Sequence, residues 1–356
     1  MQIIPLTKEN HKQWDDFCLE SDDAWFWHTS IWINYKLHYK AVLKPESKSF
    51  IVMDNNKIAA VCPLVIETTE NRKEFSFGSP YFTISPAFSN GLSSQLKNKV
   101  MKFTFDLIDK LAQENNIKRS KMRHSVLNPS FIEAPCPPFN FLLKFGYIDN
   151  SINTLIIDLR KPIKELKKDI RHGHRYDIAR GDKVFQVKIF DKNNISPEDF
   201  NQYVQLHHKH HHITRPDATF KIMYDFIKQG YGFLAGAKKD NCFVSFAYFY
   251  LYKNNVYWGS SCTDPYLQGA PVGHIIQWSA IKWMHQQGYK FYEIGWQTYS
   301  TTFSDFDTEK EAAIGKFTRG FGGFTVPCFM AEKYYDKEYF LQVYQDRIKK
   351  LYEQIN

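Results

Sequence analysis

The chain has 356 residues, of which 43% are hydrophobic and 24% are charged, and its formal net charge is +8. This length suits two domains better than one core, and the composition excludes a disordered chain. The basic excess favours anionic partners such as phosphates, but it does not require nucleic acid, because no arginine-rich arm is present.

The six cysteines are isolated from one another and none forms a Cys-x-x-Cys pair. This pattern indicates reduced thiols rather than a disulfide framework or a zinc site. Residues 1–17 include acids and lack the apolar stretch of a signal peptide, and no run of about 18 apolar residues predicts a membrane span. We therefore expect a cytoplasmic protein that makes at most transient contact with the inner face of the membrane.

The first half alternates strands and helices, as mixed α/β proteins do. Its long amphipathic helix has apolar residues at helical spacing, such as Val100, Phe103 and Leu107. The predicted strands are residues 50–53, 58–66, 81–84 and 121–125, the helix is residues 93–115, and a proline-rich loop covers residues 128–138.

The second half repeats this order with more elements. Pro162 marks the start of a basic helix, and Gly288 ends a later one. The predicted strands are residues 154–159, 185–190, 233–237, 243–251, 256–261, 291–294 and 324–330. The predicted helices are residues 162–180, 197–212, 218–228, 272–287, 309–318 and 337–355.

Both halves place strands before a loop, a long helix and a short strand, which is the element order of a GNAT-type acetyltransferase domain. We predict an α/β (α+β) protein with two tandem GNAT-like domains, each a mixed, splayed sheet flanked by helices. The predicted domains are residues 1–150, on the acceptor side, and residues 151–335, with the donor cleft; residues 336–356 form a helix that packs back on the body. In such a cleft two parallel strands separate around an extended acyl donor, and a helix start offers N–H groups to phosphates.

Residues 314–323, Ile-Gly-Lys-Phe-Thr-Arg-Gly-Phe-Gly-Gly, resemble the I-x-x-F-K-x-G-F-G-G signature of the FemAB family, the peptidoglycan-bridge aminoacyltransferase-like proteins. Other motifs follow in the family's order: S-I-W-I-N-Y at residues 30–35, a strand and basic helix at 154–181, and Q-W-S-A-I at 277–281 with E-I-G at 293–295. The resemblance covers most of the chain. It implies two GNAT-like domains, a cytoplasmic location and N-acyl transfer.

Two departures from the family bear on the donor. Thr318 stands where the signature has a lysine, a cation thought to steady the donor or the oxyanion in users of aminoacyl-tRNA, although Lys316 and Arg319 lie close by. The charged heptads of a coiled-coil arm are also missing. Residues 206–216, with L-H and T-R-P, resemble a subgroup associated with surface-polysaccharide and amino-sugar genes.

These features favour acetyl-CoA as the donor and a UDP-linked amino sugar for cell-surface glycan as the acceptor. One alternative is aminoacyl-tRNA-dependent transfer to UDP-MurNAc-peptide or lipid II. Another is a module that binds an envelope precursor without turnover. No stable nucleic-acid partner is expected under any of these hypotheses.

Amide formation needs a base for the ammonium proton and groups that stabilise the oxyanion. His208 and His211 lie in a histidine-rich segment, and Glu293 ends a short strand where the cleft should open. These three are the catalytic candidates; a polar helix face and a structural ion pair are the alternatives. His207 and His211 are one helical turn apart, but no carboxylate or cysteine follows at ligand spacing, so we expect no metal.

Aromatic, hydroxyl and cationic side chains near the motifs are the candidates for substrate contacts, with a surface ion pair or a solvated face as the alternative for each cation. They are Trp32, Tyr35, Lys36, Arg171, Arg175, Arg215, Trp258, Ser260, Ser261, Trp296, Lys316 and Arg319. The candidates for binding the pyrophosphate of the cofactor are Gln268, Gly269, Ala270, Val272 and Gly273. Pro271 stands where the first glycine of a GNAT phosphate loop belongs, so an ordinary helix start is the alternative there.

Overall fold

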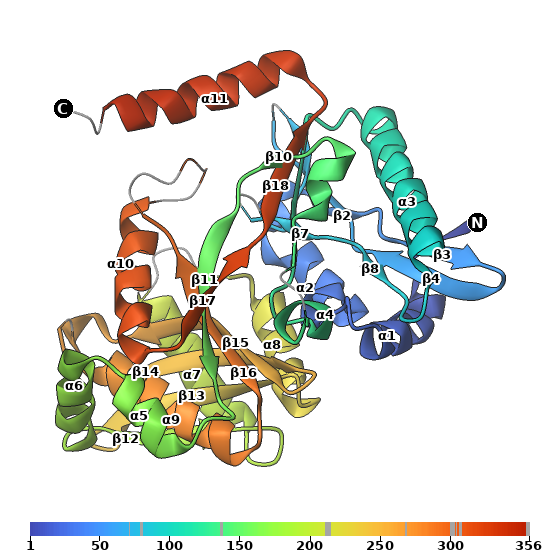
Figure 1. Cartoon of the computed structure of the whole chain (residues 1–356). Helices are drawn as coiled ribbons and strands as arrows, with labels where there is room; N and C mark the ends of the chain where they lie inside the picture. Colours follow the sequence, from blue (N-terminus) through green and yellow to red (C-terminus); the bar gives the residue numbers. More distant parts are fainter. Residues whose placement is uncertain are drawn as a thin grey trace. The chain divides into compact units, whose positions relative to one another are not determined.

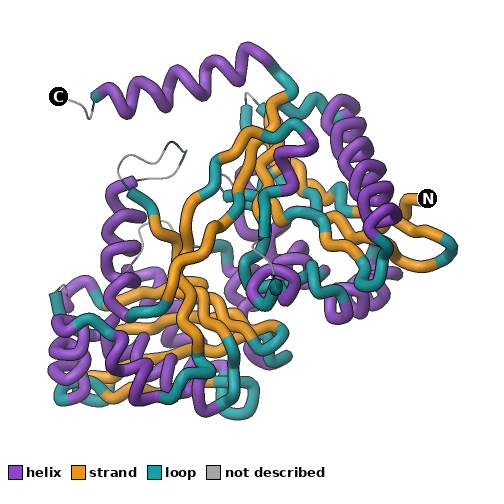
Figure 2. Tube along the Cα trace, in the orientation of Figure 1, coloured by secondary structure: helices purple, strands orange, loops and turns teal. Residues whose placement is uncertain are grey.

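The computed structural model describes residues 1–70, 72–78, 81–135, 138–210, 215–267, 269–299, 303, 305 and 308–353. The chain divides into two compact units (Figure 1). Unit 1 contains Met1–Asn153, Thr298–Ala312 and Pro327–Asn356, and unit 2 contains Thr154–Gln297 and Ala313–Val326. Helices and strands alternate in both units (Figure 2), and each unit has a sheet with parallel and antiparallel pairs, which confirms the predicted α/β class.

Unit 1 is built on two sheets. One has the strand order β1-β3-β4-β8, and the other has the order β10-β18-β9-β6-β5-β2, with β7 also pairing β9. The strands are β1 (Gln2–Pro5), β2 (Glu46–Ser47), β3 (Phe50–Asp54), β4 (Lys57–Cys62), β5 (Val65–Thr68), β6 (Lys73–Phe75), β7 (Thr83–Ile84), β8 (Ala87–Phe88), β9 (Arg119–Arg123), β10 (Ile148–Asp149) and β18 (Met330–Tyr334). The α-helices of its described residues are α1 (His11–Glu20), α2 (Ser30–Tyr39), α3 (Ser94–Glu114), α4 (Pro129–Ile132) and α11 (Lys337–Tyr352).

Helix α3 forms because its apolar residues make one stripe and its first turn is capped. Ser93 accepts a hydrogen bond from the backbone N–H of Leu96, which satisfies one of the free donors at the helix start. Val100, Phe105 and Ile108 are buried in a core cluster with residues of β3, β4 and β6. The helix agrees with the predicted residues 93–115.

In unit 1 the chain leaves the sheet between β6 and β7 and then returns to the same neighbour. Residues 74–75 of β6 pair in parallel with residues 119–120 of β9, and residues 83–84 of β7 pair with residues 122–123. Lys121 is the β9 residue between the two paired stretches. The pairing with β9 is therefore interrupted by residues 76–82 and then resumes. We call residues 76–82 the β6–β7 excursion.

Unit 2 has one seven-stranded sheet with the order β12-β13-β14-β15-β16-β11-β17. Its strands are β11 (Ile152–Asp158), β12 (Gln186–Phe190), β13 (Gly232–Lys239), β14 (Cys242–Tyr252), β15 (Asn255–Thr263), β16 (Phe291–Gln297) and β17 (Phe324–Cys328). The α-helices of its described residues are α5 (Ile163–Asp169), α6 (His172–Asp182), α7 (Pro197–His210), α8 (Asp217–Lys228), α9 (Val272–Gln286) and α10 (Thr308–Thr318), of which α10 begins in the segment grouped with unit 1.

Helices cover both faces of this sheet, and neighbouring residues of β14 identify which helices lie on which face. Phe249 joins a core cluster with Val272 and Ile276 of α9, and that cluster also includes residues of α5 and α6. Tyr248 points to the opposite face, where its hydroxyl donates a hydrogen bond to the carbonyl of Met223 on α8 (2.9 Å). Helices α5, α6 and α9 therefore lie on one face, and α7 and α8 lie on the other.

Three elements differ from their predicted bounds for local reasons. The predicted helix 162–180 is divided into α5 and α6 because Ile170 adopts an extended conformation, with φ −67° and ψ 131°. The predicted strand 58–66 is divided between β4 and β5 at Pro63, which has no N–H for the ladder. Strand β18 pairs β9 and β10, so residues 327–335 group with unit 1, whereas the sequence placed them with the second domain.

Within the described ranges, no helix is both long enough and apolar enough to span a bilayer.

Candidate active site

The parallel pair β15–β16 of unit 2 separates halfway along its length. The two strands pair at Asn255 with Phe291, at Val256 with Tyr292, and at Tyr257 with Glu293, and the pairing ends there. Strand β15 continues to Thr263 while bonded to β14 on its other side. We call the unpaired residues, 258–263 of β15 and 294–297 of β16, the strand opening. Such an opening leaves backbone N–H and C=O groups available to an extended ligand.

Glu293 lies at the point where the opening begins. Its side chain is 1% exposed, and its Oε1 accepts a hydrogen bond from the Thr154 hydroxyl (2.9 Å). Tyr292 packs on the face that carries α9, so Glu293 points to the face of α7 and α8. A buried carboxylate at the start of the opening is the arrangement expected of a proton acceptor for an incoming ammonium group.

Three predicted residues, Trp258, Ser260 and Ser261, lie on the part of β15 that belongs to the strand opening. Trp258 is half-buried against the α9 core, and Ser261 is exposed. Ser260 points to the other face, where its hydroxyl lies 3.3 Å from that of Tyr203 on α7. Trp296 is half-buried on β16 within the opening. The structure therefore brings these four predicted residues to the two strands that separate.

The histidines of α7 occupy different environments. His208 is exposed and its ring packs beside Phe220, and His211 lies outside the described residues. His207 was not among the catalytic candidates, but it is buried on the sheet side of α7, with its ring against Tyr203 and Phe220. His207 and Tyr203 are one helical turn apart, and this spacing in the sequence could have predicted that both lie on the buried face of α7.

The two residues just before α9 offer no amide donor to a phosphate. The N–H of Ala270 donates to the carbonyl of Leu267 (3.0 Å), and Pro271 has no N–H. Val272 is buried in the core, whereas Gly269 is exposed and has a positive φ of +82°. Gly273 lies beside the ring of Phe317, and Gln268 lies outside the described residues. Of the predicted pyrophosphate-binding residues, Ala270 therefore has no free N–H, and the neighbouring Pro271 supplies none.

The Gly-Phe-Gly-Gly end of the family motif serves close packing in unit 2. A Cβ at Gly320 would overlap the ring of His174, and a Cβ at Gly323 would overlap the carbonyl oxygen of Ile156 on β11. At Gly322, which has a φ of +80°, a Cβ would lie 2.8 Å from the carbonyl oxygen of Asp169. Only glycine allows these approaches together with the positive φ values.

We expect Gly323→Ala to lower the unfolding free energy of unit 2 by about 3 kcal/mol. The new Cβ would overlap the carbonyl oxygen of Ile156, and alanine is strained at the φ of +93°. Denaturant unfolding followed by a probe in unit 2 measures this loss. Gly288→Ala is the matched control, since Gly288 has a φ of +76° and open space around a Cβ, and should cost about 1 kcal/mol. Equal losses in the two variants would contradict the packing role.

Thr318, which replaces the family lysine, is fully buried. Its hydroxyl accepts a hydrogen bond from Gln297 Nε2 (3.0 Å) and donates one to the carbonyl of Gly315 (3.1 Å). Gln297 also accepts a hydrogen bond from the exposed Arg319 through its Oε1 (3.0 Å). Because Gln297 ends β16, this bond places a cation beside the strand opening. Lys316 is exposed on α10.

The two predicted arginines of the basic helix have partners in unit 2. Arg175 donates to the carbonyls of Lys168 (2.9 Å) and Ile170 and so caps the end of α5. Arg171 donates to Nδ1 of His174 (3.1 Å), whose Nε2–H donates to the carbonyl of Phe317 (2.8 Å). Burial lowers the pKa of His174, which matches this neutral tautomer. Arg215 is half-buried and donates to the sulfur of Met223 (3.2 Å).

In unit 1, Lys36 lies among aromatic rings. Its ammonium is 4.8 Å from the ring centroid of Trp32, 4.7 Å from that of Tyr39 and 5.9 Å from those of Tyr35 and Tyr81. Lys40 lies 5.9 Å from the ring of Tyr81, and burial lowers its pKa, although Glu67 opposes this. We call Trp32, Tyr35, Lys36, Tyr39, Lys40 and Tyr81 the lysine–aromatic cluster.

Residues of the β6–β7 excursion complete the surroundings of this cluster. Gly78 has a φ of +78°, and a Cβ there would lie 3.0 Å from the ring of Tyr39 and 3.8 Å from the ammonium of Lys36. The Glu67 carboxylate holds the excursion by accepting hydrogen bonds from the Ser76 hydroxyl and the Gly78 N–H. The predicted rings of Trp32 and Tyr35 are buried, whereas Tyr39 is half-buried and Tyr81 is exposed. Two ammonium groups beside the rings of Tyr39 and Tyr81 suit an anionic ligand that also has a planar group.

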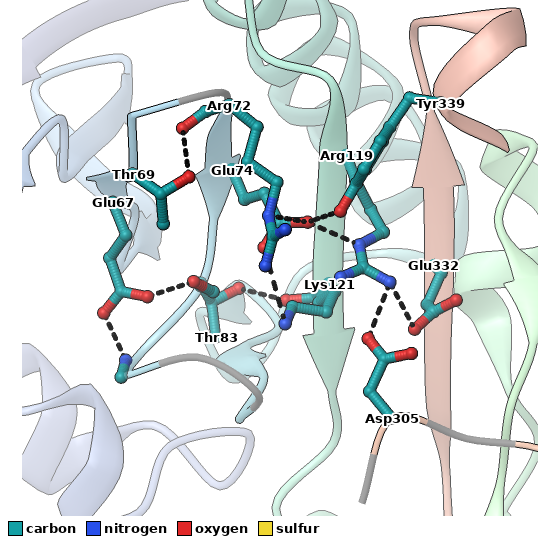
Figure 3. Close-up of polar contacts among 12 residues, drawn as sticks. Glu67, Thr69, Arg72, Glu74, Thr83, Arg119, Lys121, Asp305, Glu332 and Tyr339 are labelled. Atoms are coloured by element: carbon teal, nitrogen blue, oxygen red, sulfur yellow. Dashed lines mark hydrogen bonds and ion pairs between the residues drawn. The ribbon is translucent and has the colours of Figure 1, made fainter. Parts of the chain in front are cut away.

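Unit 1 also contains a group of buried charged side chains that the sequence analysis missed (Figure 3). We call Glu74, Arg119, Lys121, Asp305, Glu332 and Arg347 the buried charge cluster. Arg119 donates from Nε to Glu74 (2.7 Å) and forms an ion pair with Asp305 (2.8 Å). Arg347 donates to Glu332 and Asp305, at 2.8 Å in each case. Burial raises the pKa of Asp305, but the nearby arginines outweigh it and lower that pKa to about 2.

No protein-family model and no curated protein matches the sequence. Solved structures do match. FemX has a TM-score of 0.65 at 11% identity, covering 97% of this chain and 100% of FemX. L-PGS from Bacillus licheniformis has a TM-score of 0.57 at 11% identity, covering 96% of this chain and 97% of L-PGS. A tandem GNAT protein from the clavulanic acid biosynthesis pathway has a TM-score of 0.54 at 10% identity, covering 94% and 98%. These likenesses show that the chain has the FemAB-like tandem GNAT fold, which confirms the predicted fold.

Proposed function

We propose that the chain is an N-acyltransferase that moves an aminoacyl group from the 3′ end of a tRNA to an amine of an anionic, nucleotide-linked envelope precursor. The observation that carries the proposal is the separation of β15 from β16 beside the buried Glu293. The strand opening would receive the activated acyl group through backbone hydrogen bonds. FemX and L-PGS share the fold over nearly their whole lengths, and this likeness supports the proposal.

The proposed reaction forms one bond and breaks one. The acceptor nitrogen attacks the ester carbonyl carbon, and the tetrahedral intermediate collapses as the bond from that carbon to the tRNA 3′-oxygen breaks. The Glu293 carboxylate takes a proton from the ammonium nitrogen before it attacks and passes that proton to the departing 3′-oxygen; the second proton of the nitrogen is lost to solvent as the amide forms. Arg319, held by Gln297 at the end of β16, would stabilise the negative charge of the intermediate.

The residues just before α9 depart from a CoA pyrophosphate loop, and this departure supports an aminoacyl ester as the donor. In such a loop, N–H groups before the helix join those of its first turn in binding the pyrophosphate. Here the Ala270 N–H is already bonded to Leu267, and Pro271 has none. Strand β9 of unit 1 is a less suitable place for the donor than the strand opening of unit 2. Its pairing resumes beyond Lys121, and buried charged groups surround that residue. We therefore place the donor in unit 2.

Thr318 favours a second candidate, acetyl-CoA-dependent acetylation of a UDP-linked amino sugar. A threonine hydroxyl carries no charge, and that of Thr318 is buried and already hydrogen-bonded. It therefore cannot replace the cation that the FemAB signature has at this position. Radiolabelled aminoacyl-tRNA and radiolabelled acetyl-CoA, each incubated with the chain and UDP-linked amine acceptors, separate the two candidates. The proposal expects a labelled amide from aminoacyl-tRNA. Acetyl transfer with release of free thiol, and none from tRNA, would overturn it.

The lysine–aromatic cluster is proposed to bind the diphosphate and base of the acceptor. We expect Lys36→Ala to raise the KM for a UDP-linked acceptor by about 10- to 100-fold, because a charged hydrogen bond is worth about 1.5–3 kcal/mol, with kcat nearly unchanged. Initial-rate kinetics measure the effect. Lys12→Ala removes a lysine of unit 1 that is 87% exposed and should change neither constant. An unchanged KM in Lys36→Ala would place the acceptor elsewhere.

A further inference from the structure

Residues 160–183 hold a large share of the chain's positive charge. They contain nine Lys and Arg and four Asp and Glu, so they carry +5 of the chain's net +8. Five of these cations lie on α5 and α6 of unit 2, and the other four lie just before, between or just after the two helices. The sequence analysis identified a basic helix here but did not connect it with nucleic acid, because no arginine-rich arm is present.

Most of these cations face solvent and lack carboxylate partners. Lys164, Lys167, Lys168 and Lys183 are exposed, and none of them forms an ion pair with another residue of the described part of the chain. Lys164 and Lys168 are one helical turn apart, and Lys167 lies beside them on the same side of α5. By contrast, Lys161 is paired with Asp169 (2.9 Å). We call these four unpaired lysines, with Tyr176 and Arg180, the basic surface.

The extent of the basic surface exceeds what a small phosphate ligand needs. At about 1.5 Å per residue, α5 with seven residues and α6 with eleven are about 10 Å and 16 Å long. Positive charges spread over two helices of this length suit a polyanion with several phosphates better than a single phosphate group. Tyr176 on α6 is 61% exposed, and the guanidinium of Arg180, which is also paired with Asp177 (3.2 Å), lies 5.6 Å from its ring centroid. Exposed aromatic and arginine groups together are typical of surfaces on which nucleotides stack.

The same helices have no apolar side chains left for a membrane. Leu166, Ile170 and Ile178 are buried in the core cluster of unit 2. A helix that binds a bilayer surface needs an exposed apolar stripe as well as cations. The outward side of α5 and α6 offers charge and one aromatic ring, and this composition favours RNA over a lipid surface.

Helix α6, which carries Tyr176 and Arg180 of the basic surface, packs against the start of α9. A Cβ at Gly181 of α6 would lie 3.0 Å from the side chain of Ile275 and 3.2 Å from the carbonyl oxygen of Pro271. Helix α9 follows β15, the strand that forms one side of the strand opening. From these observations we infer that the basic surface of α5 and α6 docks the phosphate backbone of the tRNA whose aminoacyl end enters the strand opening; this inference rests on the proposed function.

The test compares the triple variant Lys164→Ala/Lys167→Ala/Lys168→Ala with a matched control, Lys337→Ala/Lys349→Ala/Lys350→Ala, which removes three exposed lysines from α11. Fluorescence anisotropy with deacylated tRNA at several KCl concentrations gives the slope of log affinity against log salt. The basic-surface variant should lose about two to three from that slope and bind tRNA at least about tenfold more weakly in 0.1 M salt. The control should match the wild type.

Tyr176→Ala keeps every charge and should weaken tRNA binding about tenfold without changing the slope. Equal slopes for the wild type and the basic-surface variant, with aminoacyl transfer intact in both, would overturn the docking surface but leave the proposed function standing. A wild type that binds no tRNA and acetylates from CoA would overturn both. Loss of binding to vesicles with anionic lipid in the basic-surface variant, without any tRNA binding by the wild type, would assign the surface to a membrane instead.

Discussion

Glu293→Gln is expected to lower kcat for amide formation by about 10²- to 10⁴-fold, the range that positioned general bases contribute. Glutamine keeps the oxygen that accepts the hydrogen bond from Thr154 and keeps the volume of a side chain that is 1% exposed. It cannot accept the ammonium proton. Unit 2 should therefore stay folded while the chemical step slows. Single-turnover rates with aminoacyl-tRNA measure the loss, and thermal unfolding checks the fold.

Glu198→Gln is the matched control, because Glu198 is an exposed glutamate in the first turn of α7. It should change the rate by less than about twofold. A Glu293→Gln enzyme with a rate within threefold of the wild type would rule out the base role. A large drop in unfolding temperature with proportional loss of activity would make Glu293 a structural residue instead.

Arg119→Met should destabilise unit 1 by about 3–5 kcal/mol, because removal of one partner leaves buried carboxylates without their cation. Arg119 is 2% exposed and neutralises Glu74 and Asp305 at 2.7 and 2.8 Å. For a unit of this size the loss corresponds to a fall of roughly 10 °C in Tm. Urea unfolding followed by a probe in unit 1 measures the change.

Lowering the pH should weaken the same buried charge cluster and so destabilise unit 1. The pKa of Asp305 is lowered to about 2 from an ordinary value of 3.8, so its ionised form contributes stability above pH 4 that is lost as the pH falls towards 2. In Arg119→Met this loss should begin at a higher pH. Lys102→Ala is the control, because Lys102 makes a surface ion pair with Asp106 in unit 1 and is 74% exposed; it should cost less than about 1 kcal/mol. A similar cost in both variants would contradict the account of the buried charge cluster.

Elements with a clear periodic pattern could be predicted from the sequence. Helix α3 has both an apolar stripe and a serine cap, and its observed bounds agree with the prediction. The strands that separate in unit 2 were also found, since each is apolar and bounded by turn residues or a glycine. Glu293 was predicted to end its strand, whereas β16 continues to Gln297 and Glu293 is the last of its residues that pairs with β15.

Contacts between distant segments could not be read from local patterns. Strand β9 has the sequence Arg-Ser-Lys-Met-Arg, which resembles an exposed edge strand, yet Arg119 and Lys121 are buried. Their burial depends on Glu74 and on Asp305, which is far along the chain. Likewise, the extended conformation of Ile170 divides a helix that has no glycine or proline at that point, and the cap from Arg175 is a feature of the folded unit.

The central claim is that the strand opening of unit 2 holds the activated acyl group. A crystal structure with a non-hydrolysable amide analogue of the aminoacylated tRNA 3′ end tests it most directly. The account predicts the analogue between residues 258–263 of β15 and residues 294–297 of β16, with its amino acid carbonyl next to Glu293. Density for the analogue at any other place, or β15 and β16 paired along their whole lengths, would contradict it.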